Sequence, residues 1–188
     1  MLSGLRHKDL VFIDTETTGI VFGFHEIIDV AAIKCSADGR EIKERWNTRI
    51  KPKYPERATE SAKSANGFSY ELWAHCDVNS SDIWEEFAGR FSGCVPVCHN
   101  PSFDRAFITL AATAAGVNSL GVDYHWIGTE SIAWPIYKQG KMGDDLNLFR
   151  LCEMLRIEPE PVPHTALGGA ESCFRLYRGL MTLFYESG

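Results

Sequence analysis

Two carboxylates, Asp14 and Glu16, stand one residue apart at the end of a short apolar run. Side chains at positions i and i+2 of a strand share a face, so these two are expected to point the same way. Like charges held side by side are unfavourable unless something neutralises them, and divalent cations bind such oxygen ligands. Thr17 to Gly19 is expected to form a tight loop where backbone approaches a ligand closely. The pattern favours a metal site over an acidic strand end beside a turn.

Asp104 and His164 are candidates for the same site. Asp104 follows an apolar strand and stands at the start of a predicted helix, and His164 follows a proline-rich stretch just before the last predicted helix. Functional residues in open sheets gather beyond the strand ends, so both are expected to approach Asp14 and Glu16. Taken alone, Asp104 would only favour its helix N-terminus and His164 would be an ordinary loop histidine. Their order and combination favour the functional interpretation.

The elements that must position these groups are those of a mixed sheet with helices packed on it. Apolar or alternating runs predict strands over Leu10–Asp14, Glu26–Lys34, Glu41–Ile50 and Cys94–Cys98, with a hairpin turn at Ala37–Gly39. Periodic patterns predict helices over Ser81–Phe91, Arg105–Ala115, Leu146–Leu155 and Ala166–Leu183. The stretch 126–133 is interpreted as a strand followed by a loop. With no linker in sight, one domain over residues 1–188 is expected.

Three motifs, taken in order, resemble the DEDDh family of 3′–5′ exonucleases, which contains epsilon-type proofreading subunits and RNase T-like enzymes. They are Asp14-x-Glu16-Thr-Thr-Gly, Asn100-x-x-Phe103-Asp104 and His164-x-Ala-Leu. The resemblance covers nearly the whole chain. It implies an α/β, ribonuclease H-like fold, with a mixed sheet flanked by helices. It also implies hydrolysis of terminal phosphodiesters with two divalent ions, Mg²⁺ or Mn²⁺.

The resemblance further implies a role for each residue. In the family's scheme Asp14 bridges both ions, Glu16 helps to hold the first and Asp104 supports the second. His164 takes the proton of the attacking water, which a neutral imidazole can accept near neutral pH. The residues expected on the substrate side are Thr17, Thr18, Asn66, Phe68, Asn100 and Phe103. From the residues alone, Asn100 ties down its own turn and Phe103 belongs to the core.

Gly169 is a departure from the family pattern. The family has an aspartate, the fourth acidic ligand, five residues after the histidine, and here Gly168 and Gly169 occupy that part of the helix. Glu171 follows two residues later, a rotation of about 200° that should turn it away from the site. The missing acid predicts weak activity, better with Mn²⁺ than Mg²⁺, that Gly169→Asp would raise. The competing hypothesis is that the paired glycines bend the backbone and bring Glu171 in.

Composition narrows the function classes only partly. A net charge of −6 over 188 residues argues against a protein that coats nucleic acid, but not against a nuclease that works through metal ions. The scattered cysteines form no zinc pattern and are expected to be buried thiols of a cytoplasmic protein. No run could cross a membrane, and residues 1–9 lack a signal-peptide core.

The expected partner is therefore nucleic acid with a free 3′ end, with DNA, RNA and short oligonucleotides left open as substrates, and the oligomeric state also left open. The alternative function is a catalytically weakened module that binds 3′ ends or a partner protein. A non-nuclease metal hydrolase gains little support, because the sequence has no histidine-rich metal set.

Overall fold

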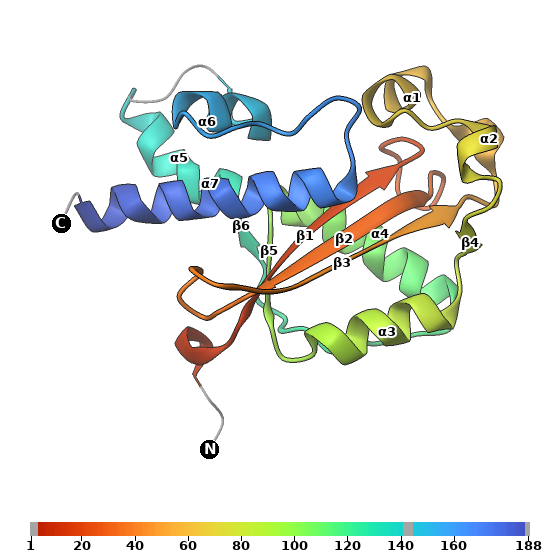
Figure 1. Ribbon diagram of the computed structural model, residues 1–188, viewed down its shortest axis with the longest axis horizontal. Helices are drawn as coiled ribbons and strands as arrows, with labels where there is room; N and C mark the ends of the chain where they lie inside the picture. Colours follow the sequence, from red (N-terminus) through yellow and green to blue (C-terminus); the bar gives the residue numbers. More distant parts are fainter. Residues whose placement is uncertain (1–3, 141–144, 187–188) are drawn as a thin grey trace.

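The central layer is a mixed sheet, in the computed structural model that describes residues 4–140 and 145–186 (Figure 1). The first three residues of the stretch 1–9 considered above lie outside this part. The described residues form a sheet with strand order β4-β3-β2-β1-β5-β6. The strands are β1 Leu10–Thr17, β2 Ile27–Cys35, β3 Ile42–Lys51, β4 Asp77–Val78, β5 Val95–Cys98 and β6 Ile127–Gly128.

Strand β1 lies at the centre of this sheet and carries the first candidate residues. It pairs antiparallel with β2 and parallel with β5, and β2 continues antiparallel to β3. Glu16 faces Asp29 of β2 in this register, and the pairing shifts between Glu16 and Thr17. Asp14 and Glu16 thus lie inside a strand three residues longer than predicted.

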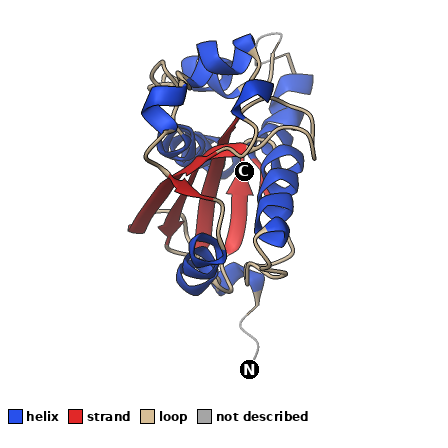
Figure 2. Cartoon of the chain, turned by 90° about the vertical axis from the view of Figure 1, so that its right-hand side faces the viewer, coloured by secondary structure: helices blue, strands red, loops and turns tan. Residues whose placement is uncertain are grey.

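Helices cover both faces of the sheet, as the side view in Figure 2 shows. Val11 and Ile13 of β1 pack in one core with α3 and α4, and Leu10 and Phe12 pack in the other core with α7. This alternation follows from the two-residue period of a strand. The helices are α1 Glu60–Asn66, α2 Tyr70–Trp73, α3 Ser81–Phe91, α4 Pro101–Ala114, α5 Thr129–Lys138, α6 Leu148–Met154 and α7 Ala166–Glu186, with single 3₁₀ turns at Leu5–His7 and Pro55–Arg57.

Several elements differ from the sequence prediction. Helix α5 occupies residues expected to be a loop, and it contains Pro135. Helix α4 begins at Pro101, four residues earlier than predicted, because Asn100 caps it and proline suits a first helical position. Helices α1 and α2 and the short strand β4 were not predicted, since each is too short to show a clear period.

None of the described helices is long and apolar enough to cross a membrane. All six cysteines are free, and all but Cys76 are buried, as the sequence predicted for most of them.

Candidate active site

Asp14 and Glu16 lie on the face of β1 that helix α7 covers. They continue the alternation of Leu10 and Phe12, which pack against α7. The first turns of α7 come so close that a Cβ atom added at Gly169 would lie 2.5 Å from Cγ of Asp14. Both carboxylates therefore sit where the end of the central strand meets the start of the last helix.

Asp104 reaches the site from the other side of the sheet. It lies in the first turn of α4, whose N-terminus is fixed by the Asn100 side chain accepting a hydrogen bond from the backbone N–H of Ser102. Asp104 is buried, and its Oδ1 accepts a 2.9 Å hydrogen bond from the Thr15 hydroxyl. Thr15 stands between Asp14 and Glu16, so this bond ties the third carboxylate to the strand that carries the first two.

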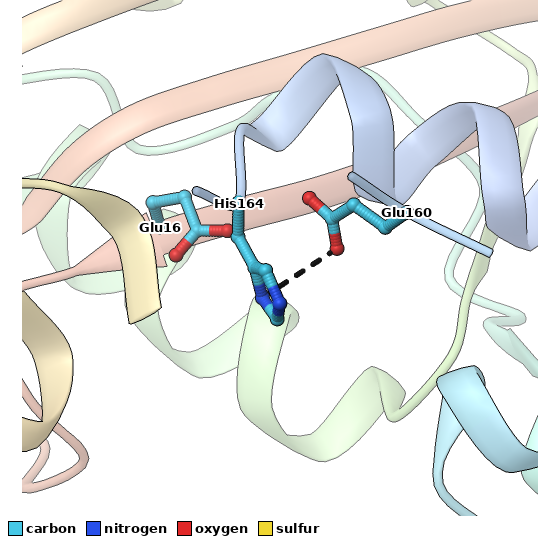
Figure 3. A group of neighbouring side chains, drawn as sticks. All are labelled: Glu16, Glu160 and His164. Carbon is cyan, nitrogen blue, oxygen red and sulfur yellow. Dashed lines mark ion pairs between the residues drawn. The ribbon is translucent and has the colours of Figure 1, made fainter. Parts of the chain in front are cut away.

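His164 enters from the loop between α6 and α7. Its backbone N–H donates to the carbonyl of Ala65, 2.8 Å away, which fastens the loop to helix α1. The ring nitrogen Nδ1 lies 3.6 Å from Oε2 of Glu160. Glu16, Glu160 and His164 each offer one potential metal-ligand atom, and these atoms all lie within 4.8 Å of one another. Figure 3 shows the two carboxyl groups on either side of the histidine ring.

A cleft of about 550 Å³ joins these groups. Its walls include all four predicted catalytic residues, Asp14, Glu16, Asp104 and His164. The other lining residues come from β1, from the loop before α7, and from the starts of α4 and α6 with the residues that precede them, among them Asn100, Phe103, Phe149 and Arg150. The structure thus brings together the three parts of the sequence that the motifs predicted, and it adds a fourth, the start of α6, that they did not.

Burial dominates the electrostatics of the carboxyl groups. It raises the pKa of Asp14 well above its ordinary range, and the negative charge of Asp104 raises it further. Burial, followed by the charge of Glu160, raises the pKa of Glu16 to about 8. The pKa of Asp104 rises to about 7, again through burial, although the Thr15 hydroxyl partly opposes the rise.

No lysine or arginine within residues 4–140 and 145–186 forms an ion pair with these carboxyl groups or with Glu160. Hard oxygen donors packed together without a cationic partner suit Mg²⁺ or Mn²⁺. The residues present therefore fit the divalent ions that the family resemblance implies.

Three of the predicted substrate-side residues have their polar side-chain groups engaged within the protein, and a fourth is buried. The hydroxyl of Thr17 donates to the Gly19 carbonyl, and that of Thr18 accepts from the Glu26 N–H. The Asn66 amide donates to the carbonyl of Thr17 and accepts from the N–H of Phe68. Phe68 itself is buried. These side chains shape the loop beside β1, and their contact with a nucleotide stays a prediction.

Asn100 and Phe103 do line the cleft. Asn100 also ties down its own turn, as its residue type predicted. Phe103 packs against the core formed with α3 and α4, and its ring lies 4.8 Å from that of Phe107, centroid to centroid. Each residue therefore combines the structural role expected from the residues alone with a place at the candidate site.

Sequence reasoning missed Glu160, which lines the cleft. It lies in a loop between prolines, where no periodicity could mark it. Glu171, in contrast, faces away as its rotation predicted, because its carboxylate pairs with Arg45 of β3 at 3.1 Å and with Arg175 at 3.8 Å. The hypothesis that the paired glycines bring Glu171 into the site is wrong.

The sequence is similar to parts of larger polymerases. PolC-type DNA polymerase III of Thermotoga petrophila is 29% identical over 108 residues, which make up 57% of this chain and 8% of the polymerase. The same protein of Thermotoga maritima is 29% identical over 100 residues, 53% of this chain and 7% of that one. The match thus spans less than a tenth of the length of these curated relatives.

Solved nucleases share the fold. Cell-death related nuclease 4 has a TM-score of 0.76 at 13% identity, covering 95% of this chain and 65% of its own. The nuclease domain of 3′hExo, a DEDDh family member bound to rAMP, has a TM-score of 0.72 at 14% identity. The match covers 95% of this chain and 92% of the 3′hExo domain. Zinc-bound exonuclease I of E. coli with single-stranded DNA has a TM-score of 0.76 at 15% identity. The match covers 94% of this chain and 41% of exonuclease I.

A family model described as exonuclease, of the RNase T type, matches residues 11–177. This range contains every candidate residue described above, and the sheet and flanking helices match the ribonuclease H-like fold of the solved exonucleases. The chain therefore belongs to the RNase T-like exonuclease family.

Proposed function

We propose that this exonuclease removes nucleotides from the 3′ ends of DNA or RNA with the help of divalent metal ions, Mg²⁺ or Mn²⁺. The observation that carries the proposal is the meeting of Asp14, Glu16, Asp104 and His164 in one cleft. Two neighbours in fold are described with matching ligands: a 3′-exonuclease that recognises the 3′ end of a histone mRNA stem-loop, and exonuclease I with single-stranded DNA.

In this proposal Asp14, Glu16 and Asp104 hold the metal ions. Bound there, paired ions would stabilise the negative charge on the attacking and leaving oxygens of the phosphodiester. The protein's own contribution is to keep the carboxylates together despite their mutual repulsion. The Thr15 hydrogen bond to Asp104 and the packing of α7 over Asp14 provide this constraint.

His164 is proposed to be the general base that takes a proton from the attacking water. Its side chain is 41% exposed, which leaves the ring accessible to water and substrate. The hydrogen bond from its backbone N–H to the Ala65 carbonyl holds the residue in place. Asn100 and Phe103, which line the same cleft, are proposed to contact the terminal nucleotide.

A cleavage assay on single strands tests the function. Oligonucleotides of DNA and RNA, labelled at the 5′ end to show a shortening ladder, are incubated with Mg²⁺, Mn²⁺ or EDTA. We expect stepwise shortening from the 3′ end with metal and none with EDTA or in Asp14→Ala. Shortening from the 5′ end, or full activity in EDTA, would contradict the proposal.

A second candidate, binding of 3′ ends without turnover, is favoured by the missing acid at Gly169. The same oligonucleotides distinguish the two. Retention of a 3′-hydroxyl strand in a binding assay, with no cleavage by either metal at high enzyme concentration, would support the binding module over the enzyme.

A further inference from the structure

We propose that Glu160 supplies the metal-binding carboxylate that the chain lacks at Gly169. The inference rests on the proposed metal-dependent function and names a ligand within that site. Glu160 comes from the loop ahead of α7 rather than from the helix itself. Glu160 would thus provide the fourth acidic ligand from a different position in the chain.

The position of Glu160 is that of a ligand. Its side chain is only 11% exposed, yet it lines the cleft together with Asp14, Glu16 and Asp104. A potential ligand oxygen of Glu160 lies within 4.8 Å of such atoms of Glu16 and His164. Figure 3 shows its carboxylate turned toward the same space as that of Glu16. Small side-chain movements would bring such donors onto one ion, since metal–oxygen distances are about 2.0–2.2 Å.

The paired glycines explain how Glu160 gains this place. A Cβ atom at Gly168 would lie 3.2 Å from Cγ and 3.3 Å from Oε1 of Glu160, which is tighter than an ordinary contact. A Cβ atom at Gly169 would meet the carboxylate of Asp14. One glycine thus leaves room for Glu160 and the next for Asp14. An aspartate at position 169 would need space that Asp14 occupies in this chain.

Within residues 4–140 and 145–186, the protein backbone holds one of the two oxygens of Glu160. Oε1 accepts a 2.9 Å hydrogen bond from the N–H of Thr165, while Oε2 is directed to His164 at 3.6 Å. Near this group Asp29 is buried, and its Oδ1 has no hydrogen-bond partner among the described residues. Asp29 adds a further negative charge beside Glu160, and its unpaired oxygen is one that a nearby cation would stabilise.

A structural role for Glu160 must be separated from the ligand role. Glutamine at position 160 keeps an oxygen that can accept the Thr165 N–H, so Glu160→Gln preserves the loop contact and removes the charge. Glu171→Gln is the matched control, because it makes the same change in an acid that pairs with Arg45 on the outside. Glu16→Gln serves as the positive control.

The experiment is a calorimetric titration of Mn²⁺ into metal-free protein without nucleic acid, with circular dichroism to verify folding. We expect Glu160→Gln to weaken Mn²⁺ binding by about 10- to 100-fold, the range typical for groups that support a metal site. Glu171→Gln should bind like the unmodified protein, and Glu160→Ala should weaken binding as much as Glu160→Gln.

Unchanged Mn²⁺ affinity in a folded Glu160→Gln protein would overturn the inference and leave the proposed function standing. Equal weakening of Mn²⁺ binding in Glu171→Gln would also overturn it. The loss would then follow from the protein's lower net negative charge and not from a missing ligand. Absence of Mn²⁺ binding to the unmodified protein would instead reject the metal-dependent function, and the ligand role with it.

Discussion

The carboxyl groups of the cleft resist ionisation when no metal is bound. The pKa of Glu16 rises from its ordinary value of 4.5 to about 8, mainly through burial. The pKa of Asp104 rises from 3.8 to about 7, again mainly through burial. Between the ordinary and raised values the folded protein binds more protons than the unfolded chain, so the free energy of unfolding decreases as pH rises. This stabilising contribution is complete below about pH 4 and is lost as pH passes through 7 to 8.

Thermal melts in EDTA from pH 5 to about pH 8 check this expectation, since the metal-free melting temperature should decrease across that range. Glu16→Gln cannot titrate at that position and should show a shallower decrease. Saturating Mn²⁺ should reverse the trend, because the metal competes with protons for the same oxygens. A melting temperature that increases with pH in EDTA would show that these groups ionise freely in the folded state.

His164 is expected to affect catalysis much more than metal binding. If it takes the proton of the attacking water, His164→Ala should lower the cleavage rate by roughly 10²–10⁴-fold. The loop before α7 should keep its conformation in this variant, because the backbone hydrogen bond from residue 164 to Ala65 does not depend on the side chain. Rates on a labelled strand and Mn²⁺ titration of the same variant measure the two effects. An unchanged rate, or a loss of Mn²⁺ binding equal to that in Glu16→Gln, would assign the histidine another role.

The sequence predicted single residues well where a motif fixed them, and poorly elsewhere. Asp14, Glu16, Asp104 and His164 meet as the motifs predicted. Glu160 was missed because a loop residue between prolines carries no periodic signal. The engagement of Asn66 and Phe68 in the loop beside β1 could not be inferred, because it depends on contacts with residues distant in sequence.

At the level of elements, the start of α7 is where the chain departs from its family. From sequence, Gly169→Asp was expected to raise activity. The structure opposes this, because any Cβ at that position meets the Asp14 carboxylate. We expect Gly169→Ala to weaken Mn²⁺ binding by about 10-fold or more through displaced Asp14, although alanine favours a helix over glycine by roughly 1 kcal/mol.

Gly89 offers the matched control for that substitution. It lies in α3, and a Cβ atom there would have nothing within 4 Å. Gly89→Ala should raise the free energy of unfolding by about 0.4–1 kcal/mol and leave Mn²⁺ binding unchanged. Urea unfolding and Mn²⁺ titration of both variants provide the comparison. Normal Mn²⁺ affinity in Gly169→Ala would show that Asp14 can rearrange without loss.

Element boundaries show which signals the sequence carries. The amphipathic pattern gave the bounds of α3, Ser81–Phe91, as the structure has them. Helix α4 begins at Pro101 rather than at the predicted Arg105, because asparagine before proline is itself a helix-start signal. Helix α5 was missed because a proline at position 135 argues against a helix, and tertiary packing of Ala133 overrides it.

On the scale of the molecule, the site lies at the end of the central strand β1, between the helices that cover the two faces of the sheet. One side of β1 packs against α7, the other against α3 and α4, and the strand's last residues emerge between them (Figure 1). Sequence alone predicted the layers through their periodicities. The convergence of β1, α4 and the loop before α7 was predicted from the places of the candidate residues at strand and helix ends, and the family resemblance added their roles, because no local pattern specifies distances between remote segments. The extent of a single domain over residues 1–188 stays a prediction.

Metal binding should stabilise the whole fold, because the cleft joins β1, α4, α6 and the loop before α7 around like charges. At a free Mn²⁺ concentration about 100 times the dissociation constant, binding adds roughly 2.7 kcal/mol to the free energy of unfolding. For a chain of this size each kcal/mol corresponds to roughly 2–4 °C, so the melting temperature should rise by several degrees over that in EDTA. The double variant Asp14→Asn, Glu16→Gln lacks the central ligands and should show no such rise. A shift of equal size in that variant would place the stabilising ion elsewhere on the molecule.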